Sequence, residues 1–116
     1  MKNVSLRLYN TARNIDVDES GDLIIAGNRV LLGLIVTNLR TSSLFLKLYD
    51  KATAPTVGTD TPKITIALPT LNFRYIPLEG GIPFSLGIGV GATTAVADSD
   101  TGAPSTNECI ITALYL

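Results

Sequence analysis

The chain has 116 residues, of which 46% are hydrophobic and 16% are charged, and its net charge is −1 at pH 7. A chain of this length can bury a hydrophobic core as one domain, so we expect residues 1–116 to form a single domain. The near-neutral charge excludes the basic field that nucleic-acid binding requires. The charged fraction lies well below the average of about 25%. We therefore expect surplus apolar surface that contacts another subunit or a larger particle, with a surface rich in Thr, Ser and Asn as the alternative.

Residues 1–22 are the most polar part of the chain. Near the start, Val4, Leu6 and Leu8 alternate with polar residues, which predicts a short first strand. Residues 10–22 are predicted to be a loop because they lack this alternation and end in a Ser-Gly-Asp turn signal. The whole segment is interpreted as an N-terminal strand and an arm that reaches a neighbour.

The middle of the chain carries short apolar runs separated by turn residues. Residues 23–26 are predicted to be a strand, and Gly27-Asn28 is predicted to be a two-residue hairpin turn. Residues 29–39 are almost continuously apolar, which favours a strand buried on both faces or one that faces a neighbouring subunit. Residues 44–49 alternate, which predicts a strand with its leucines pointing inward.

Two further strands are predicted at residues 63–68 and 72–76, followed by a tight loop at residues 77–81. Residues 84–90 alternate between apolar residues and Ser or Gly, which predicts a strand. Its glycine side would let another backbone or sheet come close.

The chain ends in residues 109–116, which are apolar almost throughout. Because both faces of this predicted strand are apolar, we expect it to lie in the centre of a sheet. About eight short strands and no helix of ordinary length predict an all-β fold, an antiparallel β-sandwich that is jelly-roll-like.

The sequence lacks the groups that most catalytic sites use. It has no histidine and a single cysteine, Cys109, which excludes His-based nucleophilic catalysis, His-bound metals and thiolate zinc sites. The glycines at 87, 89 and 91 do not form a phosphate loop, because they lie in a predicted strand and no helix follows. We therefore expect no enzymatic activity, no catalytic or cofactor-binding residue and no cofactor.

Two acidic clusters are candidates for calcium binding. One is the Asp98-Ser99-Asp100 loop, and the other consists of Asp16, Asp18, Glu19 and Asp22. Both lack the rest of a calcium loop, so the alternative is that their carboxylates cap turns, and no metal site is assigned. Paired carboxylates of the glycosidase kind are not excluded by the number of acids, but nothing singles out a pair.

No charged N-terminal region followed by an apolar run opens the sequence, so no signal peptide is expected. The longest apolar run, residues 30–36, is too short to cross a bilayer, and no membrane partner is expected. We expect the protein to be made, and to fold first, in a cytoplasm.

Two stretches of the sequence form a familiar pattern. Residues 45–62 read FLKLYDKATAPTVGTDTP, and residues 81–88 read GIPFSLGI and are followed by the Asp98-Ser99-Asp100 loop. Over residues 37–104 this resembles a set of small β-sandwich virion structural proteins of tailed bacteriophages and prophages. Residues 1–28 lie outside the resemblance.

The resemblance implies a non-enzymatic component of the virion, synthesised in the cytoplasm of the bacterial host. Its implied role is capsid decoration (cement), with a tail or fibre component as the alternative. The implied partners are the major capsid protein or other virion proteins, and the expected state is a homo-oligomer, with a trimer as the first guess. A carbohydrate-binding sandwich is the third class, against which the absence of Trp and the few aromatic residues count.

Overall fold

The structure is a computed structural model, and it describes residues 8–116. These residues form eight strands in two antiparallel sheets of four strands each. The strands are β1 (Asn10–Asn14), β2 (Asp22–Ala26), β3 (Arg29–Asn38), β4 (Leu44–Asp50), β5 (Ile64–Leu68), β6 (Asn72–Phe84), β7 (Gly87–Thr93) and β8 (Cys109–Tyr115). The described residues contain no helix, and therefore none that could cross a membrane.

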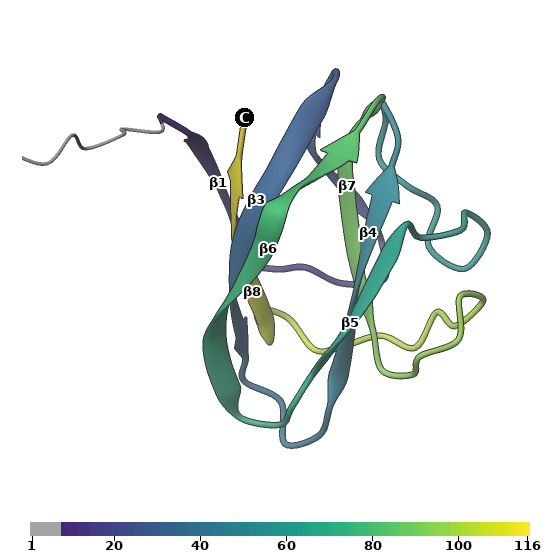
Figure 1. Cartoon of the computed structure of the whole chain (residues 1–116). Helices are drawn as coiled ribbons and strands as arrows, with labels where there is room; N and C mark the ends of the chain where they lie inside the picture. The colour runs from purple at the N-terminus through teal and green to yellow at the C-terminus, as the bar shows by residue number, and fades with distance from the viewer. Residues whose placement is uncertain (1–7) are drawn as a thin grey trace, which may run out of the picture.

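The strand order is that of a jelly roll. Sheet A has the order β1-β8-β3-β6, and sheet B has the order β2-β7-β4-β5 (Figure 1). Among strands that follow one another in sequence, only β4 and β5 pair; every other connection crosses from one sheet to the other. This confirms the predicted all-β sandwich, because the two sheets pack face to face over one apolar core.

The core lies between the sheets and is built from alternate residues of each strand. Sheet B contributes the leucines of β4, as predicted, together with three residues of β7. The core residues of the four central strands are Leu31, Leu34, Val36, Leu44, Leu46, Leu48, Ile88, Val90, Ala92, Cys109, Ile111, Ala113 and Tyr115.

A β-bulge interrupts the alternation in β3. The pairing with β6 and with β8 shifts between Leu31 and Gly33, so that Leu31 and Leu34 both point into the core. Residues Leu32 and Gly33 therefore lie together on the outer side, as a bulge allows. Of the two alternatives for β3, burial on both faces within the chain is wrong, because Ile35 on its outer face is 42% exposed. The other alternative, a face toward a neighbouring subunit, stays a prediction.

The N-terminal interpretation is wrong over the described residues. Residues 10–14, predicted to be loop, form β1, which pairs with β8 along its whole length. The polar sequence concealed this strand, because an edge strand can be stabilised by backbone pairing and the single inward contact of Ala12. Val17 lies in the core, so residues 10–17 are not an arm. The strand predicted at residues 4–8 lies outside the described residues except for Leu8.

Two predicted turns in the middle of the chain are also wrong. The Gly27-Asn28 turn does not close a hairpin, because β2 and β3 lie in different sheets. The loop predicted at residues 77–81 lies within β6, where Gly80 and Gly81 have positive φ and the register with β3 shifts. These glycines supply the conformations that L side chains disfavour.

The strand predicted at residues 84–90 is divided between the sheets. Phe84 ends β6 in sheet A, and β7 begins at Gly87 in sheet B. Between them Ser85 and Leu86 form the crossing, and the Asp50 carboxylate accepts hydrogen bonds from both of their backbone N–H groups. Strict alternation in the sequence did not reveal this crossing, because Leu86 is apolar but exposed.

The C-terminal prediction is confirmed. β8 lies between β1 and β3 in sheet A and pairs with both of them. Its last residues are held in place by backbone hydrogen bonds in both directions between Leu116 and Val30.

Candidate interaction surface

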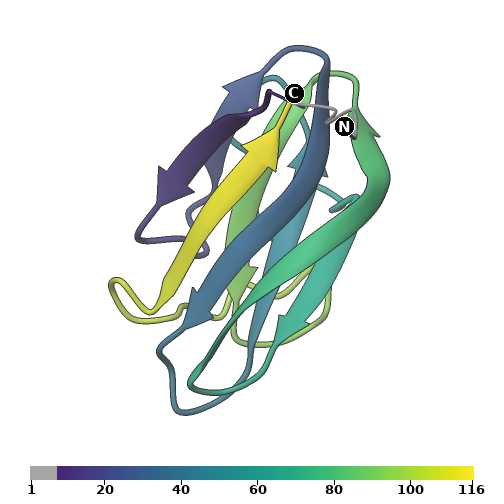
Figure 2. The same ribbon diagram turned by 60° about the vertical axis from the view of Figure 1, so that its left-hand side comes forward.

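The outer face of sheet A is an apolar surface that the described chain leaves uncovered. Figure 2 shows this face, with β1, β8, β3 and β6 side by side and no described loop crossing them. We call it the bare face and define it by the outward-pointing residues of the four strands: Thr11, Arg13, Leu32, Gly33, Ile35, Thr37, Phe73, Tyr75, Pro77, Ile110, Thr112 and Leu114.

The registers place these residues in rows across the sheet. One row runs Arg13, Thr112, Ile35, Tyr75, and the next runs Thr11, Leu114, Gly33, Pro77. The aromatic side chains Phe73 and Tyr75 lie on β6, whereas the outward residues of β1 and β8 are not aromatic.

Gly33 provides the space in which Tyr75 lies. A Cβ atom added at Gly33 would be 3.0 Å from Cε1 of Tyr75 and 3.3 Å from its hydroxyl oxygen. The ring therefore leans along the sheet over the glycine, and one of its sides remains open to solvent. Phe73, two residues earlier on the same strand, is 74% exposed, and Tyr75 is 57% exposed.

Two hollows extend the bare face at its ends. A cleft of about 310 Å³ is lined by Tyr9, Leu32, Tyr75, Pro77, Leu78, Glu79, Gly80, Gly81 and Leu114. At the opposite end, a smaller hollow of about 160 Å³ lies between Leu39, Leu71 and Phe73. Within the bare face and these hollows, only Arg13 and Glu79 carry charge. Such a long, weakly charged apolar surface is typical of a protein interface.

A third cleft, of about 430 Å³, lies outside the bare face, between the edge strands β1 and β2. Arg13 and Asp22 are among its lining residues, and Asn14 donates a hydrogen bond to the Asp22 carboxylate at 3.0 Å. This hydrogen bond links β1, at the edge of sheet A, to β2, at the edge of sheet B, and so helps to close the sandwich on this side.

The outer face of sheet B, which we call the covered face, is closed by the chain's own loops. The loop after β4 places Pro55 and Val57 against β7, where Cβ atoms at Gly89 and Gly91 would be 2.9 Å and 2.5 Å from them. This confirms the prediction that the glycine side of this strand admits another backbone.

Lys47 and Tyr49, which point outward from β4, are fully buried beneath these loops. Nζ of Lys47 donates a hydrogen bond to the Ala97 carbonyl at 2.6 Å. The Tyr49 hydroxyl has no hydrogen-bond partner, and burial, followed by the charges of Asp60 and Asp98, raises its pKa. The Lys47 hydrogen bond holds the loop after β7 onto the sheet, and both side chains are buried out of reach of a ligand.

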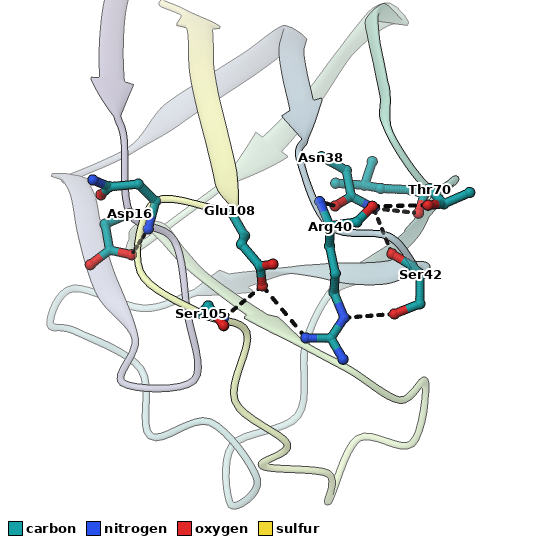
Figure 3. A network of polar contacts seen from close by, with 9 residues as sticks. Asp16, Asn38, Arg40, Ser42, Thr70, Ser105 and Glu108 are labelled. Atoms are coloured by element: carbon teal, nitrogen blue, oxygen red, sulfur yellow. Dashed lines mark hydrogen bonds and ion pairs between the residues drawn. The ribbon is translucent and has the colours of Figure 1, made fainter.

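A polar network fixes one end of the sandwich (Figure 3). The amide of the buried Asn38 donates to three backbone carbonyls, those of Ser42, Leu68 and Pro69, and its oxygen accepts from the Arg40 backbone N–H. The Arg40 guanidinium in turn lies 3.5 Å from the Glu108 carboxylate. The network joins loops from both sheets, and all of its members bond within the protein.

The acidic clusters mostly cap turns, which is the alternative that the sequence offered. Asp100 accepts from the backbone N–H groups of Ala95 and Gly102, and Asp18 accepts from that of Ser20. Asp16 accepts from Asn107. Among residues 8–116, no group of three His, Cys, Asp or Glu side chains is placed to hold a metal ion.

Cys109 faces the core from the start of β8. Burial raises the pKa of its thiol to about 12, so the thiolate that nucleophilic chemistry needs is scarce at neutral pH.

The sequence contained part of the signal for the bare face. Residues 72–76 and 109–116 each show an apolar outer side, but neither stretch tells which side faces the core or whether a loop covers the other. Comparison with known proteins finds no protein-family model that matches the chain, and no curated protein or solved structure with significant similarity to it.

Proposed function

We propose that the chain is a non-enzymatic structural protein of a bacteriophage virion, and that it acts as a capsid decoration (cement) protein. The observation that carries this proposal is the bare face, an apolar sheet surface that its own chain leaves uncovered while its loops cover the other sheet. A protein built in this way works by packing against another protein. The resemblance of residues 37–104 to phage virion proteins supplies the class of particle.

The jelly-roll order agrees with this role as an analogy of fold, because jelly rolls recur in viral capsid and lectin domains. The resembling segments form β4 with the loop that covers β7, and the crossing from β6 to β7. They therefore build the covered side of the sandwich, so the resemblance supports a shared scaffold, while the bare face is a surface for packing against another protein chain.

As a decoration protein, the chain would bind the outer surface of the assembled head at sites between major capsid subunits. The mechanism is mass action: a protein that binds the assembled shell and not the free subunits stabilises the shell by the free energy of binding. A tail or fibre component would use the same packing chemistry at another place on the particle.

Mass spectrometry of purified particles from cells that carry the gene tests the proposal, with heads and tails separated before digestion. We expect the protein in the head fraction, and a lower disruption temperature for heads from a strain in which the gene is deleted. Presence only in the tail fraction would select the alternative. Absence from both fractions, with the protein present in the lysate, would contradict the virion role.

A carbohydrate-binding role has one observation in its favour. Tyr9, Phe73 and Tyr75 are all exposed at the bare face or its cleft, and exposed aromatic rings are the usual platforms for sugars. Glu79 is the one charged group that lines this cleft, which leaves few partners for sugar hydroxyl groups. Screening the purified protein on a glycan array, with Tyr75→Ala as the matched variant, distinguishes this role from packing.

A further inference from the structure

We propose that the bare face packs against the bare face of a second copy of this chain, about a two-fold axis that runs parallel to the strands. The inference rests on the proposed function only in treating the protein as an assembled subunit. It identifies which surface joins two copies, and it implies that a particle would be contacted by other surfaces of the dimer.

The exposed apolar area of the bare face and its hollows is close to that of one side of a standard protein interface. Tyr9, Phe73 and Tyr75 are 52%, 74% and 57% exposed. At about 150–250 Å² per aromatic side chain, these three rings alone offer roughly 350 Å². Ile35, Leu39 and Leu71 are also more than one-third exposed, and together with the half-buried residues of β8 they bring the surface near the roughly 800 Å² per partner of a standard interface.

The described residues form one uncovered apolar sheet face, the bare face. Sheet B is closed by its own loops, so a second apolar sheet face is missing from residues 8–116. A two-fold interface needs only one self-complementary patch, whereas a closed ring of three needs two different patches on each copy. The single patch therefore favours a dimer over the trimer expected from the sequence.

The two edges of the bare face are complementary across the axis. A two-fold axis parallel to the strands places β6 of one copy over β1 of the other, so that Phe73 and Tyr75 lie over the non-aromatic residues of β1. Within the row Arg13, Thr112, Ile35, Tyr75, the guanidinium of one copy then faces the Tyr75 ring of the other, a favourable cation–π arrangement. Aligned packing of two sheets at about 30° keeps these pairs near one another.

Sedimentation of the purified full-length protein without particles tests the dimer. We expect a dimer at micromolar concentration, and we expect Ile35→Glu to raise the dissociation constant at least about a hundredfold, because it would bury an unpaired carboxylate. Phe73→Glu serves as a second variant if Ile35→Glu fails to fold. The matched control is Val96→Glu, which replaces an exposed apolar residue of the loop after β7 and should leave the dimer intact.

Thiol cross-linking tests the axis. Residues 13 and 75 lie three strands apart in one chain, roughly 14 Å at the usual strand spacing, whereas facing residues of two packed sheets lie about 10 Å apart. Both separations are too large for a disulfide, so the probe is a short bismaleimide whose spacer reaches across about 10 Å but not 14 Å. The double variant with Arg13→Cys and Tyr75→Cys should then form a covalent dimer, while either single variant should not. The native Cys109 is buried and should stay unreactive.

The outcomes separate this inference from the proposed function. A wild-type protein that stays monomeric at 100 μM, or a dimer that both glutamate variants leave intact, would overturn the two-fold packing, even if the protein binds heads. Cross-linking of either single variant would overturn the axis. A dimer that behaves as expected but is absent from particles would leave this inference standing and remove the virion role.

Discussion

The outer faces of the two sheets carry similar residues but have different surroundings. Tyr49 on sheet B and Tyr75 on sheet A both point outward from a strand, yet Tyr49 is fully buried and Tyr75 is largely exposed. On sheet B even a lysine, Lys47, is buried, because loops from both ends of the sandwich lie over it. On sheet A the isoleucine at position 35 is open to solvent.

The difference comes from where the chain places its long connections. Residues 51–63 and 94–108 are the two longest segments between strands, and Figure 1 shows both on the sheet B side of the molecule. The chain thus covers one apolar face with its own loops and leaves the other uncovered. The low charge of the sequence therefore corresponds to two apolar surfaces, one that the loops cover on sheet B and one that stays open on sheet A.

The largest expected loss of stability comes from shortening β8, the central strand of sheet A that carries core residues on its inner side. Deleting Leu114 to Leu116 removes Tyr115 from the core and the pairing of β8 with both β1 and β3 at this end. Loss of a large core side chain costs about 3–5 kcal/mol, against a total stability of about 5–15 kcal/mol. We expect an unfolded or insoluble protein by circular dichroism.

The control for this truncation is deletion of Leu116 alone, which removes a backbone pair with Val30 but no core side chain. Its thermal midpoint should stay near that of the full chain. If the longer truncation also melts within a degree or two of the full chain, then the end of β8 does not stabilise sheet A.

A matched pair of glycine substitutions compares the two faces directly. Gly91→Ala on the covered face would put its Cβ 2.5 Å from Cγ2 of the buried Val57, and Gly33→Ala on the bare face would contact the exposed Tyr75 ring at 3.0 Å. Neither position has positive φ, so backbone strain does not confuse the comparison. We expect Gly91→Ala to cost about 1–3 kcal/mol by overpacking.

Gly33→Ala should cost less stability than Gly91→Ala, because the Tyr75 ring can move into solvent and only the Ile76 carbonyl oxygen, 3.1 Å from the added Cβ, has to shift within the sheet. It should instead weaken self-association, since the ring leaves its place on the bare face. Urea unfolding of both variants measures the difference. Equal losses of stability would mean that the two faces are equally tightly packed, contrary to the structure.

Most strands could be predicted from the sequence, but not which strands pair with one another. The leucines of β4, the glycine side of β7 and the central place of β8 followed from alternation, because each depends on local pattern. β1 was missed because its residues, from Asn10 to Asn14, are polar and its order comes from pairing with the far end of the chain. The crossing at Ser85 and Leu86 was missed because the apolar alternation continues through it.

The bare face was predictable only as a surplus of apolar surface. Its position depends on which loops cover which sheet, and that is set by contacts between residues distant in sequence, such as Pro55 with Gly89. The acidic clusters, in contrast, depend on local contacts. Turn capping was one of the two alternatives that the sequence offered, and Asp18 and Asp100 accept the local hydrogen bonds that it requires.

A further effect, smaller than that of the C-terminal truncation, concerns Asp50, at the place where the chain passes from the bare sheet to the covered sheet. Its carboxylate accepts hydrogen bonds from the backbone N–H groups of Ser85, Leu86 and Gly87 and from the Ser85 hydroxyl. Burial alone would raise the pKa of Asp50, but these hydrogen bonds outweigh it and lower the pKa below its ordinary value. A lowered pKa means that folding favours the ionised carboxylate.

The sign of the pH dependence follows from this direction. The contribution of Asp50 is fully present above its unfolded-state pKa of about 3.9 and is lost as the pH falls through the lower folded-state value. Asp50→Asn should therefore destabilise the protein at pH 7 by about 1–2 kcal/mol, below the usual range for charged hydrogen bonds because the site is partly exposed. The difference in the free energy of unfolding between wild type and variant should shrink as the pH falls from 5 to 2.5.

Urea unfolding at several pH values measures this gap. The control is Asp98→Asn, in an exposed loop, which should show little change in stability at any of them. A gap that stays constant across this range would mean that the two sheets are joined at this crossing without help from the charge of Asp50.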